Sequence, residues 1–278
     1  MATYLFWGYP KPMAAKKKRI DELKRTDPIC YFCATRPTET EDHVPSRECF
    51  RRRVGPEGFT FPACAICNNG AGQLEQVAAL YFLLANHDTG DGSIEQLRRL
   101  ASGVANNNAE LLPSFEINAN AARGHFRRKG MNLRPGEAYG MMPLATLPPG
   151  HGDVFALFGR RLTCALYYKE VGRPLPLDHY IVAAWIPWSE VAAGKVDIVD
   201  TATEMFPALT VGNRRNTDIG DQFSYRWGVH PDSSIFGFIA QISKSFFFLG
   251  AAVSPELYHS SSENARGWRE HATDVILD

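Results

Sequence analysis

Two Cys-x-x-Cys pairs constrain this 278-residue chain more than any other feature. The first pair is Cys30 and Cys33, the second is Cys64 and Cys67, and 30 residues separate them. Each pair suits a tight turn that directs two thiolates at one ion, and two such turns complete a tetrahedral Cys₄ zinc shell. The alternatives are two redox motifs or free buried thiols. The spacing favours a Zn²⁺ site.

A closed Cys₄ shell has no open coordination position, so we expect this zinc to be structural and any chemistry to lie elsewhere. Cys49 and Cys164 have no partner at metal-ligand spacing, and we interpret both as small buried hydrophobic residues. Six cysteines, four of them in metal-like pairs, favour a reducing cytoplasm over a secreted disulfide scaffold. The longest strongly apolar run, residues 77–85, is too short to span a bilayer.

Residues that carry chemistry lie between and just after the cysteine pairs. The segment 41–45 reads Glu-Asp-His-Val-Pro, and Asn68 follows the fourth cysteine directly. A shared zinc ion would bring these two segments together in space. Carboxylate and amide oxygens suit Mg²⁺ or Mn²⁺, and an imidazole beside such an ion can act as a general base toward water. Hydrolysis of a phosphodiester needs these parts.

One geometric difficulty concerns Asp42 and His43. Neighbouring side chains on a regular strand point to opposite faces, so the two residues share one site only at a strand end or a bend. Pro45, two residues after His43, favours such a bend.

These motifs resemble a known family. The run Asp-His-Val-Pro-Ser-Arg-Glu-Cys-Phe at 42–50 and the run Phe-Pro-Ala-Cys-x-x-Cys-Asn-Asn-Gly at 61–70 are similar to the HNH endonucleases that contain a Cys₄ zinc. The resemblance covers residues 28–85 and extends more loosely to 159–176 and to the segment near Phe223. It departs from the family pattern at two places. Glu57-Gly58 stands where relatives place an orienting asparagine, and Ala71 stands where many have His or Lys.

The resemblance implies a ββα-metal fold and a nuclease activity. In that scheme His43 is the general base, while Asp42 and Asn68 are ligands of a catalytic Mg²⁺ or Mn²⁺. Such modules often serve bacterial defence or mobile elements. The implied substrate is DNA, with RNA as a second option, and a non-catalytic zinc module that binds nucleic acid or protein is the alternative. A decayed nuclease, kept as a scaffold for the C-terminal part, is a third and weaker reading. We expect no membrane partner, and the oligomeric state stays open.

Basic residues gather in the first part of the chain. Residues 1–70 hold 12 Lys/Arg against 8 Asp/Glu, whereas residues 131–278 hold 12 against 16. Arginine side chains suit phosphate oxygens, so this imbalance favours an anionic partner for the N-terminal part. The proposed nucleic-acid contacts follow the histidine closely: Arg47, Arg51, Arg52 and Arg53. A solvated loop is the alternative interpretation of these four arginines.

The hydrophobic pattern predicts an α+β chain. We expect a basic helix at 13–25, helices at about 70–86 and 93–105, a third at 117–129, and a buried helix at 154–169. The expected strands are 180–185, 223–229, 235–242 and 246–253, the last two joined as a hairpin. We divide the chain into an HNH domain at 1–90, a connector at 91–150 with a linker at 131–152, and a C-terminal α+β domain of unknown role at 151–278.

Overall fold

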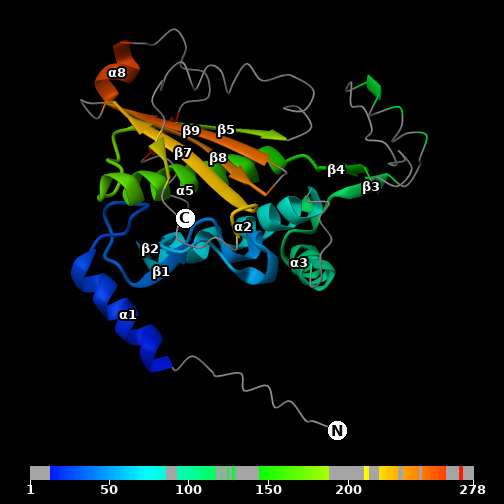
Figure 1. Cartoon of the computed structure of the whole chain (residues 1–278), viewed down its shortest axis with the longest axis horizontal. Helices are drawn as coiled ribbons and strands as arrows, with labels where there is room; N and C mark the ends of the chain where they lie inside the picture. Colours follow the sequence, from blue (N-terminus) through cyan, green and yellow to red (C-terminus); the bar gives the residue numbers. More distant parts are fainter. Residues whose placement is uncertain are drawn as a thin grey trace.

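The described part of the chain combines helices with antiparallel sheets, which confirms the α+β class (Figure 1). The structure is a computed structural model. It describes residues 13–85, 93–116, 120, 124, 127–128, 144–187, 210–212, 219–230, 234–243, 246–260 and 269–271.

The first elements are a helix, a two-stranded hairpin and a second helix. Helix α1 (Met13–Thr26) precedes strands β1 (Thr40–His43) and β2 (Thr60–Ala63), and α2 (Ala65–Ala85) begins two residues after β2 ends. The strands pair antiparallel, with Asp42 opposite Phe61 and His43 opposite Thr60. Figure 1 shows α1 extending away from the hairpin.

Helix α2 starts five residues earlier than the apolar periodicity predicts. The carboxylate of Glu39 accepts a hydrogen bond from the backbone N–H of Ala65 at 2.8 Å. An acceptor for a free N–H at a helix N-terminus stabilises the first turn. The second Cys-x-x-Cys pair therefore forms the start of the helix. The sequence did not reveal these first turns, because polar residues there interrupt the apolar periodicity.

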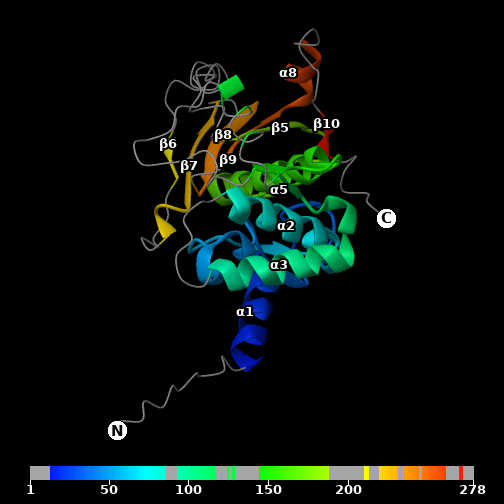
Figure 2. The same cartoon turned by 90° about the vertical axis from the view of Figure 1, so that its right-hand side faces the viewer.

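Three helices are stacked one below another beneath the larger sheet. Helix α3 (Ser93–Asn107) packs on α2, and α2 packs on α5 (His151–Val171), as Figure 2 shows from the side. The hydroxyl of Tyr81 on α2 donates to the carbonyl of Leu111 at 2.7 Å. That carbonyl belongs to the short turn η3 (Ala109–Leu111), which leads into the small pair of strands β3 (Ser114–Glu116) and β4 (Leu144–Thr146).

The larger sheet has the strand order β10-β5-β9-β8-β7-β6 and is antiparallel throughout. The predicted strands and the hairpin between β8 and β9 are confirmed, and the predicted helix at 154–169 is the body of α5. The strand bounds are β5 (Tyr180–Pro187), β6 (Thr210–Val211), β7 (Phe223–Val229), β8 (Ile235–Ile242), β9 (Phe246–Val253) and β10 (Arg269–Glu270), and the short helix α8 (Pro255–Ser260) follows β9.

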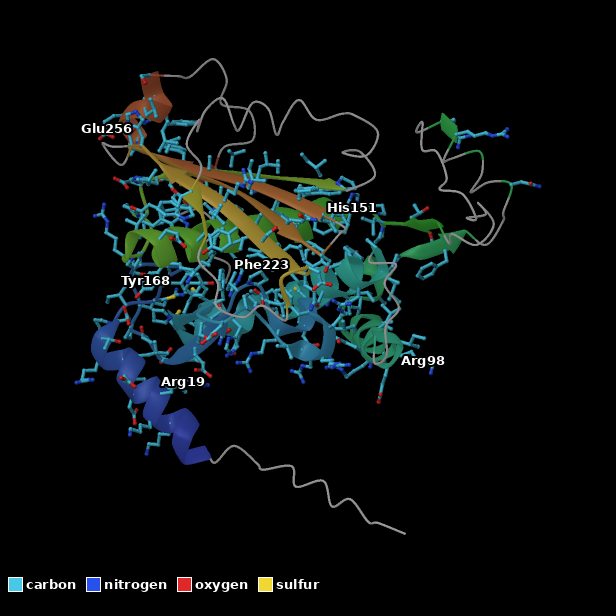
Figure 3. The ribbon with its side chains drawn as sticks, viewed as in Figure 1. Arg19, Arg98, His151, Tyr168, Phe223 and Glu256 are labelled. Carbon is cyan, nitrogen blue, oxygen red and sulfur yellow. The ribbon has the colours of Figure 1, made fainter. Side chains whose placement is uncertain are left out.

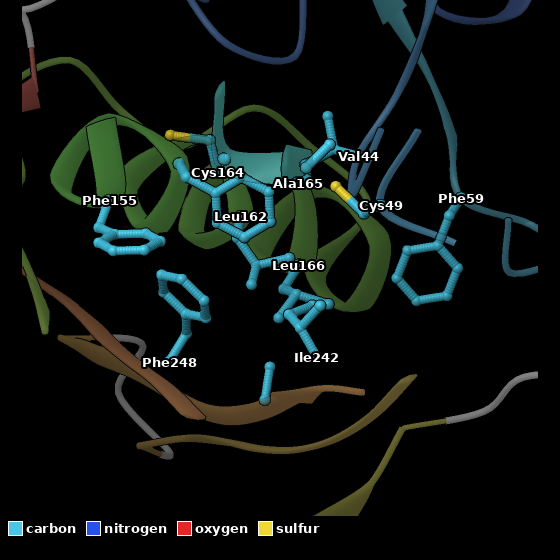
Figure 4. Packing of buried hydrophobic residues seen from close by; sticks show 14 of the residues in the cluster. Val44, Cys49, Phe59, Phe155, Leu162, Cys164, Ala165, Leu166, Ile242 and Phe248 are labelled. Atoms are coloured by element: carbon cyan, nitrogen blue, oxygen red, sulfur yellow. The ribbon is translucent and has the colours of Figure 1, made fainter. Parts of the chain in front are cut away.

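One cluster of buried side chains joins these helices to the sheet. In Figure 4, Phe155 and Leu162 of α5 lie against Phe248 of β9. The thiols of Cys49 and Cys164 are both buried in this cluster, as the sequence predicts. The same cluster includes the first cysteine pair, so side chains before residue 90 and after residue 151 share one core.

Some sequence predictions fall on other parts of the chain. The helix at 117–129 and the linker at 131–152 lie mostly outside the described residues. None of the helices in the described part combines the length and the apolar character needed to cross a bilayer.

Close contact between α5 and β5 gives a first testable prediction. A methyl group at Gly159 would lie 2.7 Å from the Cβ of Ala183, whereas one at Gly152, on the same helix, would meet nothing within 4 Å. We expect Gly159→Ala to lower the free energy of unfolding by about 1–3 kcal/mol through overpacking. Gly152→Ala should leave it unchanged or raise it by up to about 1 kcal/mol. Urea denaturation of both variants measures this, and equal stabilities would contradict the packing described.

Candidate metal centre and active site

Four cysteines form a compact, buried cluster. Cys30, Cys33, Cys64 and Cys67 place their sulfur atoms within 4.8 Å of one another, and the sulfurs of Cys33 and Cys64 are 4.0 Å apart. Tetrahedral zinc with Zn–S bonds of about 2.3 Å requires sulfurs about 3.8 Å apart. The cluster is therefore close enough to bind a metal ion such as Zn²⁺.

Backbone hydrogen bonds shape the first knuckle and join it to the hairpin. The N–H of Cys30 donates to the carbonyl of Arg36 at 2.9 Å, and the N–H of Ala34 donates to that of Cys30 at 3.0 Å. The N–H of Tyr31 donates to the carbonyl of Pro62 in β2 at 2.8 Å. In the second knuckle the N–H of Cys67 donates to the sulfur of Cys64 at 3.4 Å.

Thiols of this cysteine cluster shift one another's pKa values. Hydrogen bonds from Cys30 and Cys67 lower the pKa of Cys33, while the hydrogen bond with Cys33 is the first cause that raises the pKa of Cys30 to about 11. Four adjacent thiolates repel one another, so a cation is needed to hold them all deprotonated. The Arg36 guanidinium is hydrogen-bonded to the Cys64 sulfur, which raises the pKa of Arg36. This contact places a positive charge beside the thiolates.

His43 stands at the end of β1 with an oriented ring. Its Nδ1 lies 3.0 Å from the hydroxyl oxygen of Thr60, its cross-strand partner, and the backbone of Phe59 also hydrogen-bonds to the imidazole. Burial lowers the pKa of His43, and the charge of Arg47 lowers it further. The imidazole is therefore mainly neutral at pH 7. The Thr60 hydroxyl provides an orienting contact where the sequence lacks the expected asparagine.

Asp42 lies on the opposite face of β1, only 4% exposed. Its carboxylate accepts hydrogen bonds from the hydroxyl of Tyr31 at 2.8 Å and from the guanidinium of Arg161 on α5. The structure thus separates the side chains of Asp42 and His43, because the strand stays regular up to its last residue. The bend that would bring them to one face does not occur within β1.

Asn68 lies in the first turns of α2 and contacts β1. Its Nδ2 donates to the hydroxyl of Thr40 at 3.3 Å and to the carbonyl of Glu41 at 3.2 Å. Thr40 and Asp42 are two residues apart on the strand and so share a face. Asn68 therefore approaches the same side of the hairpin as Asp42, whereas His43 points to the other side.

The sequence did not identify Arg161 as part of this region. Its guanidinium is fully buried and also binds Glu75, with Nε donating to Oε1 at 2.9 Å. Burial raises the pKa of Glu75 to about 7, although Arg161 opposes this rise. The one available signal was the pair Arg160-Arg161 inside an otherwise apolar helix, since a buried arginine needs anionic partners.

Two of the four arginines predicted to contact nucleic acid form ion pairs with carboxylates. Arg51 is bonded to Asp221, and Arg53 forms an ion pair with Glu48 at 2.9 Å. Arg52 is exposed and Arg47 lies near His43.

Figure 3 shows Arg19 of α1 and Arg98 of α3 on the side of the molecule away from the large sheet. Arg19 is bonded to Glu41, on the same face of β1 as His43.

No family model, curated protein or solved structure matches the chain. The likeness to HNH endonucleases therefore rests on the motifs quoted above.

The effect of the Arg47 charge on His43 gives a prediction about protonation. Removing the positive charge makes protonation of the imidazole easier, so Arg47→Gln should raise the pKa of His43 toward its ordinary value. At a pH just below 6.5 the variant then carries more imidazolium than the wild type. An NMR titration of the His43 ring measures this shift.

Arg52→Gln is the matched control, because Arg52 is not among the main causes of the lowered pKa of His43. It should leave the titration unchanged. An identical curve for wild type and Arg47→Gln would show that Arg47 does not act on the ring.

Proposed function

We propose that the chain is a divalent-metal-dependent endonuclease of the HNH type, which hydrolyses phosphodiester bonds in DNA. The observation that carries the proposal is the environment of the His43 ring. Its Nδ1 lies 3.0 Å from the Thr60 hydroxyl oxygen, and burial and the charge of Arg47 lower the pKa of the ring. If Nδ1 carries the proton, the lone pair of Nε2 can accept a proton from water.

The arrangement around the cysteines supports a ββα-metal core. The chain runs from the first knuckle through β1 and β2 to the second knuckle and directly into α2. Zinc at the four sulfurs would fix the hairpin against the start of α2. Asn68 lies in the first turns of α2, where the resemblance implies the second metal ligand.

The available donor atoms fit Mg²⁺ or Mn²⁺. No hydrogen bond among the described residues reaches Oδ1 of Asp42, and the bonds of Asn68 engage only its Nδ2, which leaves its amide oxygen as an acceptor. Both are hard oxygen ligands. Bound there, the ion would supply positive charge for the phosphate. Because His43 points to the other side of the hairpin, the base and the ion would meet at one phosphate only around the end of β1, where His43 is the last residue. The protein's own part is to hold His43 neutral and to orient its ring toward water.

Contact with DNA would come from basic groups on the His43 side of the hairpin. Exposed Lys17 and Lys18 lie on α1, which Arg19 fastens to Glu41 of β1. Arg52 is exposed in the loop between the strands. Binding through such groups should weaken steeply as the salt concentration rises.

A second candidate is a zinc module that binds nucleic acid without cleaving it. The observation that favours it is the engagement of Asp42 by Arg161 on the face opposite His43. In this reading the buried Asp42 carboxylate only stabilises the fold, and the basic groups alone bind the nucleic acid.

A plasmid-cleavage assay tests the proposed nuclease. The full chain, loaded with zinc, is incubated with supercoiled DNA and Mg²⁺ or Mn²⁺. We expect nicking or linearisation, and His43→Ala should lower the rate by about 10²- to 10⁴-fold, the usual contribution of a general base. His179→Ala is the control, because that imidazole pairs with Asp178 and belongs to neither strand of the hairpin.

Cleavage that persists in His43→Ala would remove the histidine from the mechanism. If the wild type cleaves neither DNA nor RNA but retains salt-sensitive binding, the non-catalytic module is the correct reading.

A further inference from the structure

The carboxylate of Asp42 is held unevenly. Both of its hydrogen bonds reach Oδ2, one from the hydroxyl of Tyr31 and one from Nη2 of Arg161. No donor among the described residues reaches Oδ1. A buried carboxylate with one oxygen saturated and the other left as an acceptor differs from a simple salt bridge, in which both oxygens commonly take part.

Arg161 is itself fixed by contacts with several elements. Its Nε donates to Glu75 on α2, and its Nη1 donates to the backbone carbonyl of Cys67 at 2.9 Å. The guanidinium carbon lies 5.2 Å from the centre of the Phe32 ring in the first knuckle. The side chain therefore cannot turn without breaking contacts to both knuckles and to α2.

The Arg161 guanidinium pairs with two carboxylates, Asp42 and Glu75, in a buried region. These two contacts fix the guanidinium and, through it, the Oδ2 atom of Asp42. Carboxylates that bind metal ions are themselves usually hydrogen-bonded by a second layer of residues, which orients the ligand oxygen.

We propose that Arg161 and Tyr31 are positioning residues for Asp42: they hold Oδ2 and present Oδ1 to a divalent cation. The metal site then draws on both parts of the chain, because Arg161 comes from α5 and Tyr31 from the first knuckle. This inference rests on the proposed function. Its alternative is a purely structural ion pair, in which Asp42 binds no metal and serves only to neutralise Arg161.

Binding of Mn²⁺, measured by calorimetry or electron paramagnetic resonance on the zinc-loaded full chain, separates the two. The Asp42→Asn variant gives the Mn²⁺ affinity that remains when a neutral amide replaces the carboxylate. Tyr31→Phe removes one hydrogen bond to Oδ2 and should weaken Mn²⁺ binding by about 10-fold, the lower end of the effect of such outer residues. Tyr167→Phe is the matched control, because the buried Tyr167 hydroxyl meets no hydrogen-bond partner in the described part of the chain; it should bind Mn²⁺ as the wild type does.

Arg161→Lys tests the second contact. The lysine keeps the charge but loses the planar fork that reaches three acceptors, so we expect Mn²⁺ affinity to fall by about 10- to 100-fold. Arg160→Lys makes the same change one residue earlier on α5 and should have little effect. Circular dichroism and zinc content establish that each variant is folded, and if Arg161→Lys fails to fold, Tyr31→Phe decides.

Wild-type affinity in both Tyr31→Phe and Arg161→Lys would overturn the inference, and so would the absence of any Mn²⁺ binding that depends on Asp42. The nuclease proposal can fail separately. Weakened Mn²⁺ binding in the variants, combined with no cleavage by the wild type, supports the positioning role and rejects the enzyme. Cleavage by the wild type, combined with Mn²⁺ affinities that are unchanged in the variants, supports the enzyme and rejects the positioning role.

Discussion

Four sulfur atoms bring together the segments on which the rest of the N-terminal structure depends. The hairpin of β1 and β2 is only four residue pairs long, and such a short two-stranded unit is marginal in water by itself. Its two ends are continuous with the two knuckles. A metal ion at the four cysteines would therefore fix the hairpin, the start of α2 and the turn around Tyr31 in a single step. The placement of His43 follows from this arrangement, since its ring is oriented by its neighbour across the hairpin.

Arg161 is the second connection and joins the later part of the chain to the first. It lies in the middle of α5, the helix that packs against the large sheet, and its three donor groups end on β1, α2 and the second knuckle. The C-terminal residues add another contact, because the buried imidazole of His271 packs on Phe32 with ring centres 5.6 Å apart. Burial lowers the pKa of His271 to about 4, so it is neutral at pH 7. The C-terminal half thus supports the knuckles directly.

The sequence predicted what depends on local pattern. The cysteine cluster follows from spacing, and strands β7, β8 and β9 follow from apolar runs bounded by turn residues. The partners of Asp42 could not be predicted in this way. Arg161 is 119 residues away from Asp42, and only the packing of α5 on α2 brings them together. Likewise the sequence indicated an arginine cluster after His43, but not that two of its members would form ion pairs with Asp221 and Glu48.

The zinc K-edge absorption spectrum of the purified full chain tests the central claim most directly. The account predicts about one zinc ion per chain, surrounded by four sulfur atoms at about 2.3 Å, and loss of that signal together with the folded hairpin when the metal is removed. A folded chain that contains no metal, or whose zinc is bound by nitrogen or oxygen instead of four sulfurs, would contradict it.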